Sequence, residues 1–223
     1  METRLSAKKN ATLLAIAVCG VFGMLFGIIQ FNIHLLNSFS LPLRMTLVIV
    51  TQWLLFLVPG ILMLISKESL RDFGFTRKRL LKQTLIGLCI AVIMSAGLTA
   101  LPILLGVRHM IGSTNYTQAW QFAFEFIHKI AGVALAEEMI FRGHIFHKLL
   151  HIKDNKWFAI IISSILFGLF HIFTGLSIQI LTTAIIGFCY CMCREKIKNC
   201  TIFSLIIAHG VYDALIVLLV GVL

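Results

Sequence analysis

Charged side chains are scarce in this chain of 223 residues, and acidic side chains are scarcer than basic ones. Only 13% of the residues are charged, 59% are hydrophobic, and Asp and Glu together number nine. A soluble domain of this size needs far more polar surface than such a composition provides. The sequence therefore predicts an integral membrane protein.

The chain also lacks polar linkers, low-complexity segments and a convincing internal repeat. These absences predict a single integral membrane domain over residues 1–223. The six cysteines lie within apolar runs or at their inner ends, which argues against a disulfide framework. Cys189, Cys191 and Cys193 alternate, but residues two apart on a helix point in different directions. They are therefore expected to be small apolar packing residues rather than metal ligands.

About seven apolar runs are long enough to cross a bilayer, for which about 20 residues are needed. Only helices satisfy the backbone of such segments in lipid, so the expected fold class is all-α, a polytopic transmembrane helical bundle. The fourth run is polar in its first half, where Glu125, His128 and Lys129 lie, and the fifth and sixth are joined around Gly175. The expected spans are residues 11–31, 45–65, 84–107, 119–147, 157–174, 176–193 and 201–223.

The net charge of +10 is concentrated in loops and does not indicate nucleic-acid binding. Lys and Arg are frequent in the N-terminal tail and in residues 66–83, 148–156 and 194–198, and they are scarce in the loops between these segments. This alternation places the N-terminus inside and predicts a multi-pass protein of the cell membrane. The basic loop at 66–83 also favours contact with anionic lipid, so membrane lipid is an expected partner.

Small residues inside two of the spans predict contacts between helices. Gly20, Gly23 and Gly27 lie on neighbouring turns of the first span, a common device for close packing. Ser163 and Ser164 of the fifth span lack the glycine-framed setting of a membrane serine protease. They are expected to pack or to form hydrogen bonds between helices.

Three of the nine acidic residues, Glu137, Glu138 and Asp213, lie in runs apolar enough to cross the membrane, as do His171 and His209. A carboxylate at membrane depth is unfavourable by several kcal/mol unless it faces protein or water. These five residues come from the fourth, fifth and seventh runs. Three separate helices are therefore expected to build one buried polar site.

The segment EEMIFR at residues 137–142 predicts an ion pair with an available carboxylate beside it. Glu138 and Arg142 are four residues apart and therefore share one face of a helix. Glu137 is rotated by about 100° from Glu138 and cannot share Arg142 equally. Glu137 is accordingly a candidate general base.

Two further segments each bring a histidine to the predicted site. FGLFH at 167–171 places Phe167 one turn before His171, and HGVYD at 209–213 places His209 and Asp213 on one helical face. An imidazole can hold a water, transfer a proton or donate to an oxyanion, and a neighbouring carboxylate can fix its tautomer.

In this order, EEMIFR, FGLFH and HGVYD resemble the three motifs of the CAAX protease and bacteriocin-processing (CPBP, or Abi) family of membrane glutamic endopeptidases. The segment LRDFGF at 70–75 is similar to a short basic, glycine-containing stretch that often precedes the core of that family. The resemblance thus covers approximately residues 66–215.

The resemblance implies that Glu137 activates a water with help from His171, while His209 and Asp213 stabilise the tetrahedral oxyanion. It implies that Glu138, Arg142 and Phe167 support the substrate or the geometry of the site. The best-studied members have Asn where this chain has Asp213, and an ionised Asp cannot donate a hydrogen bond. Asp213 is therefore either protonated or serves to orient His209.

Other protease mechanisms fit the sequence less well. It contains no H-E-x-x-H zinc motif, and an aspartyl mechanism needs a second membrane Asp besides Asp213. His144, His147 and His151 follow at helical spacing and could form a zinc face, but they reach the inner interface and no carboxylate partner is evident. No cofactor is expected, with zinc as the alternative.

The sequence predicts an intramembrane endopeptidase that cleaves a peptide or protein near the inner membrane face. The short chain suggests a bacterial cytoplasmic membrane, and the resemblance then implies maturation of a bacteriocin or pheromone precursor, or related self-immunity. One alternative is a non-catalytic immunity protein that binds a peptide. A further alternative is a proton-coupled transporter, although no pair of broken, repeated spans is visible.

Overall fold

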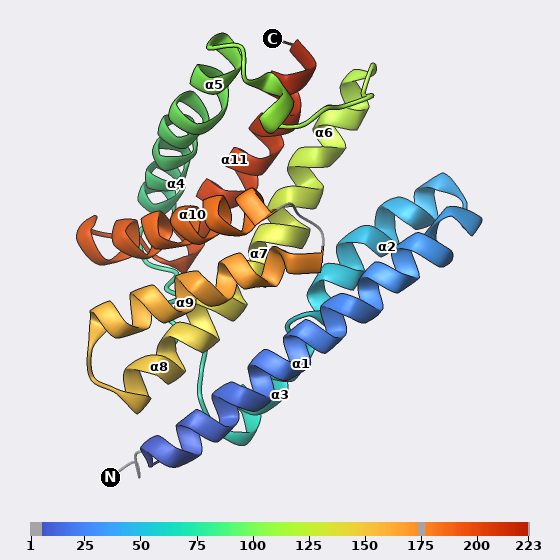
Figure 1. Cartoon of the computed structure of the whole chain (residues 1–223). Helices are drawn as coiled ribbons and strands as arrows, with labels where there is room; N and C mark the ends of the chain where they lie inside the picture. Colours follow the sequence, from blue (N-terminus) through green and yellow to red (C-terminus); the bar gives the residue numbers. More distant parts are fainter. Residues whose placement is uncertain (1–5, 174–176, 223) are drawn as a thin grey trace.

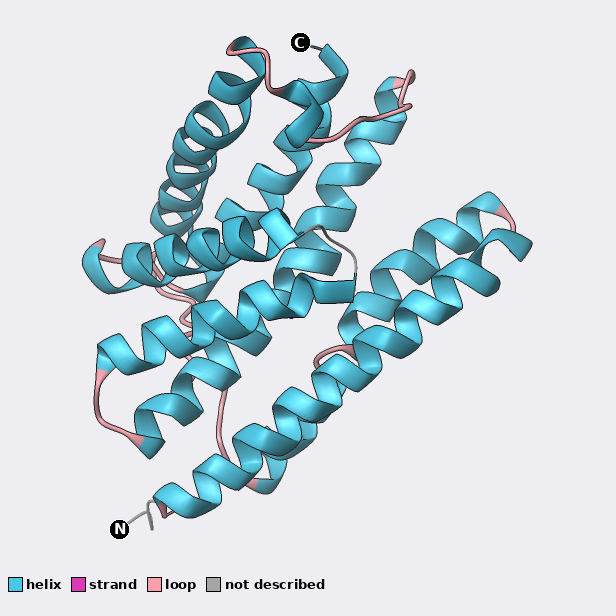
Figure 2. Ribbon diagram, in the orientation of Figure 1, coloured by secondary structure: helices cyan, strands magenta, loops and turns pink. Residues whose placement is uncertain are grey.

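The computed structural model describes residues 6–173 and 177–222, and all regular secondary structure in these residues is helical (Figures 1 and 2). The expected all-α class is confirmed. The helices are α1 (Ala7–His34), α2 (Leu41–Leu54), α3 (Leu57–Ile65), α4 (Leu80–Ser95), α5 (Leu101–Leu104), α6 (Ala119–Ile127), α7 (Leu135–Glu138), α8 (Phe146–Ile152), α9 (Lys156–Phe170), α10 (Ser177–Lys196) and α11 (Ile202–Val222). Three π-helical segments connect some of them, namely Ala96–Ala100, His128–Ala134 and Met139–Ile145.

Five helical stretches in the described residues are long and apolar enough to cross a membrane. They are Ala7–His34, Leu41–Ile65, Leu80–Leu104, Lys156–Phe173 and Ile202–Val222, which coincide with five of the expected spans. The other two expected spans are also helical where they are described, one as the α6–α8 path and the other as α10. The connection expected around Gly175 lies outside the described residues. The chain is a multi-pass, all-helical membrane protein.

Helix α1 begins and helix α11 ends at opposite ends of the molecule (Figure 1). Helix α1 starts at the same end as the connection between α8 and α9, whereas the turn between α1 and α2 lies at the far end. This arrangement agrees with an odd number of crossings. The inward orientation of the N-terminus itself stays a prediction.

Two glycines bring α11 unusually close to its neighbours, and this contact fixes the helix that holds the third motif. At Gly87 of α4, an added Cβ would lie 2.5 Å from the carbonyl oxygen of Ser204. At Gly210, an added Cβ would lie 2.5 Å from the Cα of Ile130 in the first of the two π-helical segments that flank α7. Helix α11 is therefore held between α4 and the path that leads to α7.

The glycines of the first span behave differently from the expectation. At Gly20 an added Cβ would meet Cγ1 of Val58 at 2.7 Å, so α1 and α3 are in close contact there. At Gly23 and Gly27 nothing lies within 4 Å of an added Cβ. The predicted packing role is wrong for these two residues, because α3 approaches α1 closely at Gly20 but not at the later turns.

Helix α9 is tied to the second of the π-helical segments flanking α7, Met139–Ile145, by a serine. The hydroxyl of Ser163 donates to the carbonyl of Phe141 at 2.9 Å, and both residues are buried. Ser164 instead donates within its own helix, to the carbonyl of Ile160 at 2.7 Å. The expected hydrogen bond between helices is confirmed for Ser163, and it joins the helices of the first and second motifs.

Candidate active site

The two adjacent glutamates occupy α7, a single α-helical turn between the π-helical segments His128–Ala134 and Met139–Ile145. A π-helical turn contains an additional residue, and such turns are frequent at functional sites because they redirect the side chains that follow. Both glutamates are buried, with 5% of Glu137 and none of Glu138 exposed.

Glu138 receives two hydrogen bonds at one oxygen. Its Oε1 accepts from Nη1 of Arg142 at 2.9 Å, as the spacing predicts, and from Nδ1 of His209 at 2.9 Å. Because a carboxylate paired with Arg142 only accepts, Nδ1 of His209 carries the proton. This bond fixes the orientation of the imidazole and directs Nε2 toward the other side of the site.

Two carboxylates face Nε2 of His209 without bonding to it directly. Glu137 Oε2 lies 3.8 Å away and Asp213 Oδ2 lies 3.7 Å away, both too far for a hydrogen bond. Glu137 Oε2 has no hydrogen-bond partner within the described part of the chain. The carboxylate that the sequence leaves available thus has one oxygen without a hydrogen bond among the described residues, 3.8 Å from Nε2 of His209.

The second motif contributes the ring of Phe167 and the imidazole of His171 to the site. His171, which follows the last residue of α9, donates from Nδ1 to the carbonyl of Phe167 at 3.0 Å, because a carbonyl only accepts. The ring of Phe167 lies under the guanidinium of Arg142 at 4.1 Å and meets His209 edge to face at 5.9 Å between centroids. His171 is also close enough to Glu137 for an electrostatic interaction.

All seven residues that the sequence assigns to the site lie together in one cluster. Helix α7 and the π-helical segment after it contribute the acidic pair and the arginine. The first histidine directly follows α9, and α11 contributes the last two residues. The chemical role of each residue remains a prediction, whereas their proximity is observed. The cluster consists of Glu137, Glu138, Arg142, Phe167, His171, His209 and Asp213.

Several polar atoms of the cluster are buried without a hydrogen-bond partner among the described residues. They are Oε2 of Glu137, Oε2 of Glu138, Nε and Nη2 of Arg142, and the hydroxyl of Tyr190. A buried polar group without a partner lowers stability by about 1–3 kcal/mol. A concentration of such groups indicates a place built to receive another polar molecule rather than a structural ion pair alone.

Sequence reasoning missed Tyr190, although a signal was present. This residue lies between Cys189 and Cys191, which were considered only as possible metal ligands. The signal is the hydroxyl of Tyr190, a polar group inside an apolar run. In the structure its ring lies 5.5 Å from that of His209, and it is fully buried. A tyrosine brought into the site by α10 thus joins the residues of the three motifs.

Arg194 was also missed, and it connects the site to the LRDFGF segment. Its guanidinium donates to the backbone carbonyl of Arg142 and, at 3.1 Å, to that of Phe73. Gly74 adopts a left-handed φ of 90°, and an added Cβ there would lie 2.5 Å from Nη2 of Arg194. Fully buried Phe73 packs edge to face on His144. Arg194 therefore links the segment at 70–75 to the helical segment that contains the first motif.

Two of the three histidines considered as a zinc face form polar contacts with other protein groups. His147 Nε2 lies 3.4 Å from Oε1 of Glu68, which also accepts from Lys148 Nζ at 2.6 Å. The ring of His151 donates from Nδ1 to the carbonyl of His147 at 2.9 Å. Among the residues that the structure describes, no group of three or more His, Cys, Asp or Glu side chains is placed to hold a metal ion.

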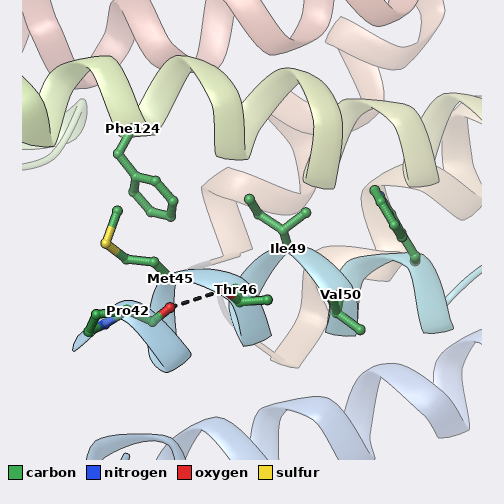
Figure 3. Close-up of a pocket in the computed structure, with 7 residues that line it drawn as sticks. Pro42, Met45, Thr46, Ile49, Val50 and Phe124 are labelled. Atoms are coloured by element: carbon green, nitrogen blue, oxygen red, sulfur yellow. Dashed lines mark hydrogen bonds between the residues drawn. The ribbon is translucent and has the colours of Figure 1, made fainter. Parts of the chain in front are cut away.

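An apolar groove of about 440 Å³ lies between α2 and α6, away from this cluster. Phe124 of α6 points toward Met45 and Ile49 of α2 (Figure 3). No titratable side chain lines the groove, so it cannot supply the chemistry of the polar cluster. Its lining consists of Pro42, Met45, Thr46, Ile49, Val50, Trp53 and Phe124.

Comparison with known families assigns the part of the chain that contains all three motifs. Residues 118–215 match the family described as type II CAAX prenyl endopeptidase Rce1-like. This segment is Rce1-like. The family resemblance predicted from the motifs is thereby confirmed, and the Rce1-like match supports an intramembrane endopeptidase that acts on a peptide or protein.

The Rce1-like segment is shorter than the core predicted from the sequence. Its match begins at residue 118, so the LRDFGF stretch at 70–75 lies outside it, and a core that starts near residue 66 stays a prediction. Comparison with curated proteins and with solved structures gives no match.

Proposed function

We propose that this protein is a metal-independent glutamic endopeptidase in which Glu137 activates the hydrolytic water. The observation that carries the proposal is the buried, unpartnered oxygen of Glu137, 3.8 Å from Nε2 of His209. Glu138 lies beside it but is occupied by Arg142 and by Nδ1 of His209. The two carboxylates thus have different tasks, one structural and one chemical.

In the proposed reaction, Glu137 takes a proton from water while the water oxygen forms a bond to the scissile carbonyl carbon. An imidazolium at His209 would carry N–H donors at both nitrogens, and Nε2 could then donate to the oxyanion. Collapse of the tetrahedral intermediate breaks the C–N bond, and the proton held by Glu137 passes to the leaving amine. His171 helps to hold the water, and Asp213 orients His209.

The partly exposed members of the cluster suggest where the substrate approaches. His171 and Asp213 are neither fully buried nor fully exposed, whereas Glu137 and His209 are each only 5% exposed. The scissile bond would therefore enter from the side of His171 and Asp213. We propose a membrane-bound precursor peptide as the substrate, in bacteriocin or pheromone maturation or in related self-immunity at a bacterial cytoplasmic membrane.

The test uses purified protein in detergent and two probes, a farnesylated CaaX peptide and an unprenylated apolar peptide. Wild-type protein should cleave at least one probe in isotopically labelled water and place one labelled oxygen in the new carboxylate. Glu137→Gln keeps the shape of the side chain but removes the base, and the rate should fall by about 10²- to 10⁴-fold.

Glu125→Gln is the matched control. Glu125 is another buried glutamate on the same helical path, but it contacts Tyr116 and His128 rather than the cluster. This control should keep nearly the wild-type rate. Cleavage by Glu137→Gln at near the wild-type rate would contradict the assignment of the base.

A peptide-binding protein without catalysis would behave differently. It would bind the probe without cleavage, and binding would survive Glu137→Gln but not Glu137→Ala, because only the amide keeps the polar contact. Activity that is lost with a chelator and restored by zinc would contradict the metal-independent mechanism.

A further inference from the structure

Tyr190 of α10 reaches the centre of the site from a helix that carries none of the three motifs. Its side chain is fully buried, and its ring lies 5.5 Å from the ring of His209 with an interplanar angle of 33°. The guanidinium carbon of Arg142 lies 5.5 Å from the centroid of the same ring. Tyr190 therefore contacts two members of the cluster directly.

The hydroxyl of Tyr190 has no hydrogen-bond partner among the described residues. Phenylalanine would fill almost the same volume without placing an unpaired polar group in the protein interior, which is unfavourable. The groups that act electrostatically on this hydroxyl include Asp213 and Glu138. The unpaired hydroxyl is thus within electrostatic range of residues that surround His209, against whose ring Tyr190 packs.

An ionised Asp213 would leave the proposed oxyanion site without a donor besides His209. Asp213 lies one turn after His209, and an ionised carboxylate accepts hydrogen bonds but cannot donate one to an oxyanion. A tyrosine hydroxyl donates while remaining neutral, and a buried donor aimed at developing negative charge stabilises a transition state strongly. Tyr190 has the donor that an ionised Asp213 lacks.

We propose that the Tyr190 hydroxyl donates a hydrogen bond to the oxyanion of the tetrahedral intermediate, next to the N–H of His209. This inference rests on the proposed peptidase function and adds a catalytic residue from α10. No bond to Tyr190 forms or breaks, and its proton stays on the hydroxyl throughout.

The test compares Tyr190→Phe with wild type on the farnesylated CaaX peptide. If the wild-type protein cleaves only the unprenylated apolar peptide, that peptide is used instead. The kcat should fall by about 10²- to 10³-fold with little change in KM, because the donor acts on the transition state. The Tm should stay equal or rise, because an unpaired buried hydroxyl has been removed. A merely structural tyrosine would instead lower the Tm.

Tyr116→Phe is the matched control. The Tyr116 hydroxyl donates to Glu125 Oε1 at 3.2 Å, outside the cluster, so its loss should leave kcat near the wild-type value. Asp213→Asn in the Tyr190→Phe background tests the role of the donor itself. The new amide supplies N–H groups beside His209 and should restore part of the lost kcat.

The outcomes separate this inference from the function on which it rests. A wild-type kcat for Tyr190→Phe, while Glu137→Gln is inactive, overturns the role of Tyr190 and leaves the peptidase in place. A fall in kcat that merely follows a lower Tm, or a rise in KM alone, also overturns it. If wild-type protein cleaves neither probe, the proposed function fails and this inference fails with it.

Discussion

Replacement of Gly210 by alanine tests whether the contact between α11 and the π-helical segment His128–Ala134 sets the geometry of the site. Gly210 directly follows His209, and an added Cβ would lie 2.5 Å from Cα and 2.8 Å from the backbone nitrogen of Ile130. Backbone atoms cannot rotate away as a side chain can. Helix α11 must therefore move as a unit.

The size of the shift follows from these distances. Carbon atoms in contact are about 3.5–4.0 Å apart, so α11 has to withdraw by about 1 Å at Gly210. The hydrogen bond from Nδ1 of His209 to Glu138 is 2.9 Å long and would stretch beyond bonding distance. A displacement of about 1 Å in a catalytic group lowers the rate by about 10²-fold, and the overpacking is expected to destabilise the protein by about 1–3 kcal/mol.

The assay measures kcat and Tm for Gly210→Ala beside Gly23→Ala, which makes the same change in a membrane helix where an added Cβ meets nothing within 4 Å. Gly23→Ala should retain wild-type activity and an equal or higher Tm. Trimming Ile130 to alanine should not rescue Gly210→Ala, because the closest contact is with the backbone. A Gly210→Ala protein that cleaves at more than half the wild-type rate would refute this reasoning.

Two further predictions concern the segment between α3 and α4. Gly74→Ala should lower both the Tm and the cleavage rate, because the residue has a φ of 90° and lies against Arg194. Unchanged values would contradict the inference that Arg194 holds this segment in place beside the site. Burial opposes ionisation of Glu68, but hydrogen bonds from His147 and Lys148 outweigh it and lower its pKa from 4.5 to about 2. Because the folded-state pKa is the lower one, this stabilisation is fully present above pH 4.5 and is lost as the pH falls toward 2. Glu68→Gln should therefore destabilise the protein at pH 7 by about 1–2 kcal/mol, and the difference in unfolding free energy from wild type should shrink across that range. A difference that does not change with pH would contradict the prediction.

Local features of the chain were predictable because they depend on neighbours in the sequence. The pair formed by Glu138 and Arg142 needs only a spacing of four residues, and it is present at 2.9 Å. The available state of Glu137 follows from the same helical rotation. These predictions hold even though a π-helical segment begins at Met139, because the pair spans only one turn.

Contacts that join distant parts of the chain were not predictable. His209 binds Glu138 across 71 positions, and Arg194 reaches Phe73 across 121. Nothing in the spacing of HGVYD indicates that Glu138, rather than Asp213, accepts the bond from His209. The spacing of Gly20, Gly23 and Gly27 likewise could not show that α3 approaches only the first of them closely.

The amino-acid sequence alone determined that the protein is a helical membrane protein, because lipid leaves no other way to satisfy the backbone of such apolar runs. It also determined which polar residues are candidates for chemistry, because so few acidic side chains lie at membrane depth. The tertiary structure decided how these residues contact one another: Glu138 accepts hydrogen bonds from Arg142 and His209, Glu137 Oε2 accepts none from the described residues, and Tyr190 of α10 packs against His209. The reason is that the packing of α10 and α11 against α7 and α9 sets these distances, and packing depends on the shapes of surfaces far apart in the chain.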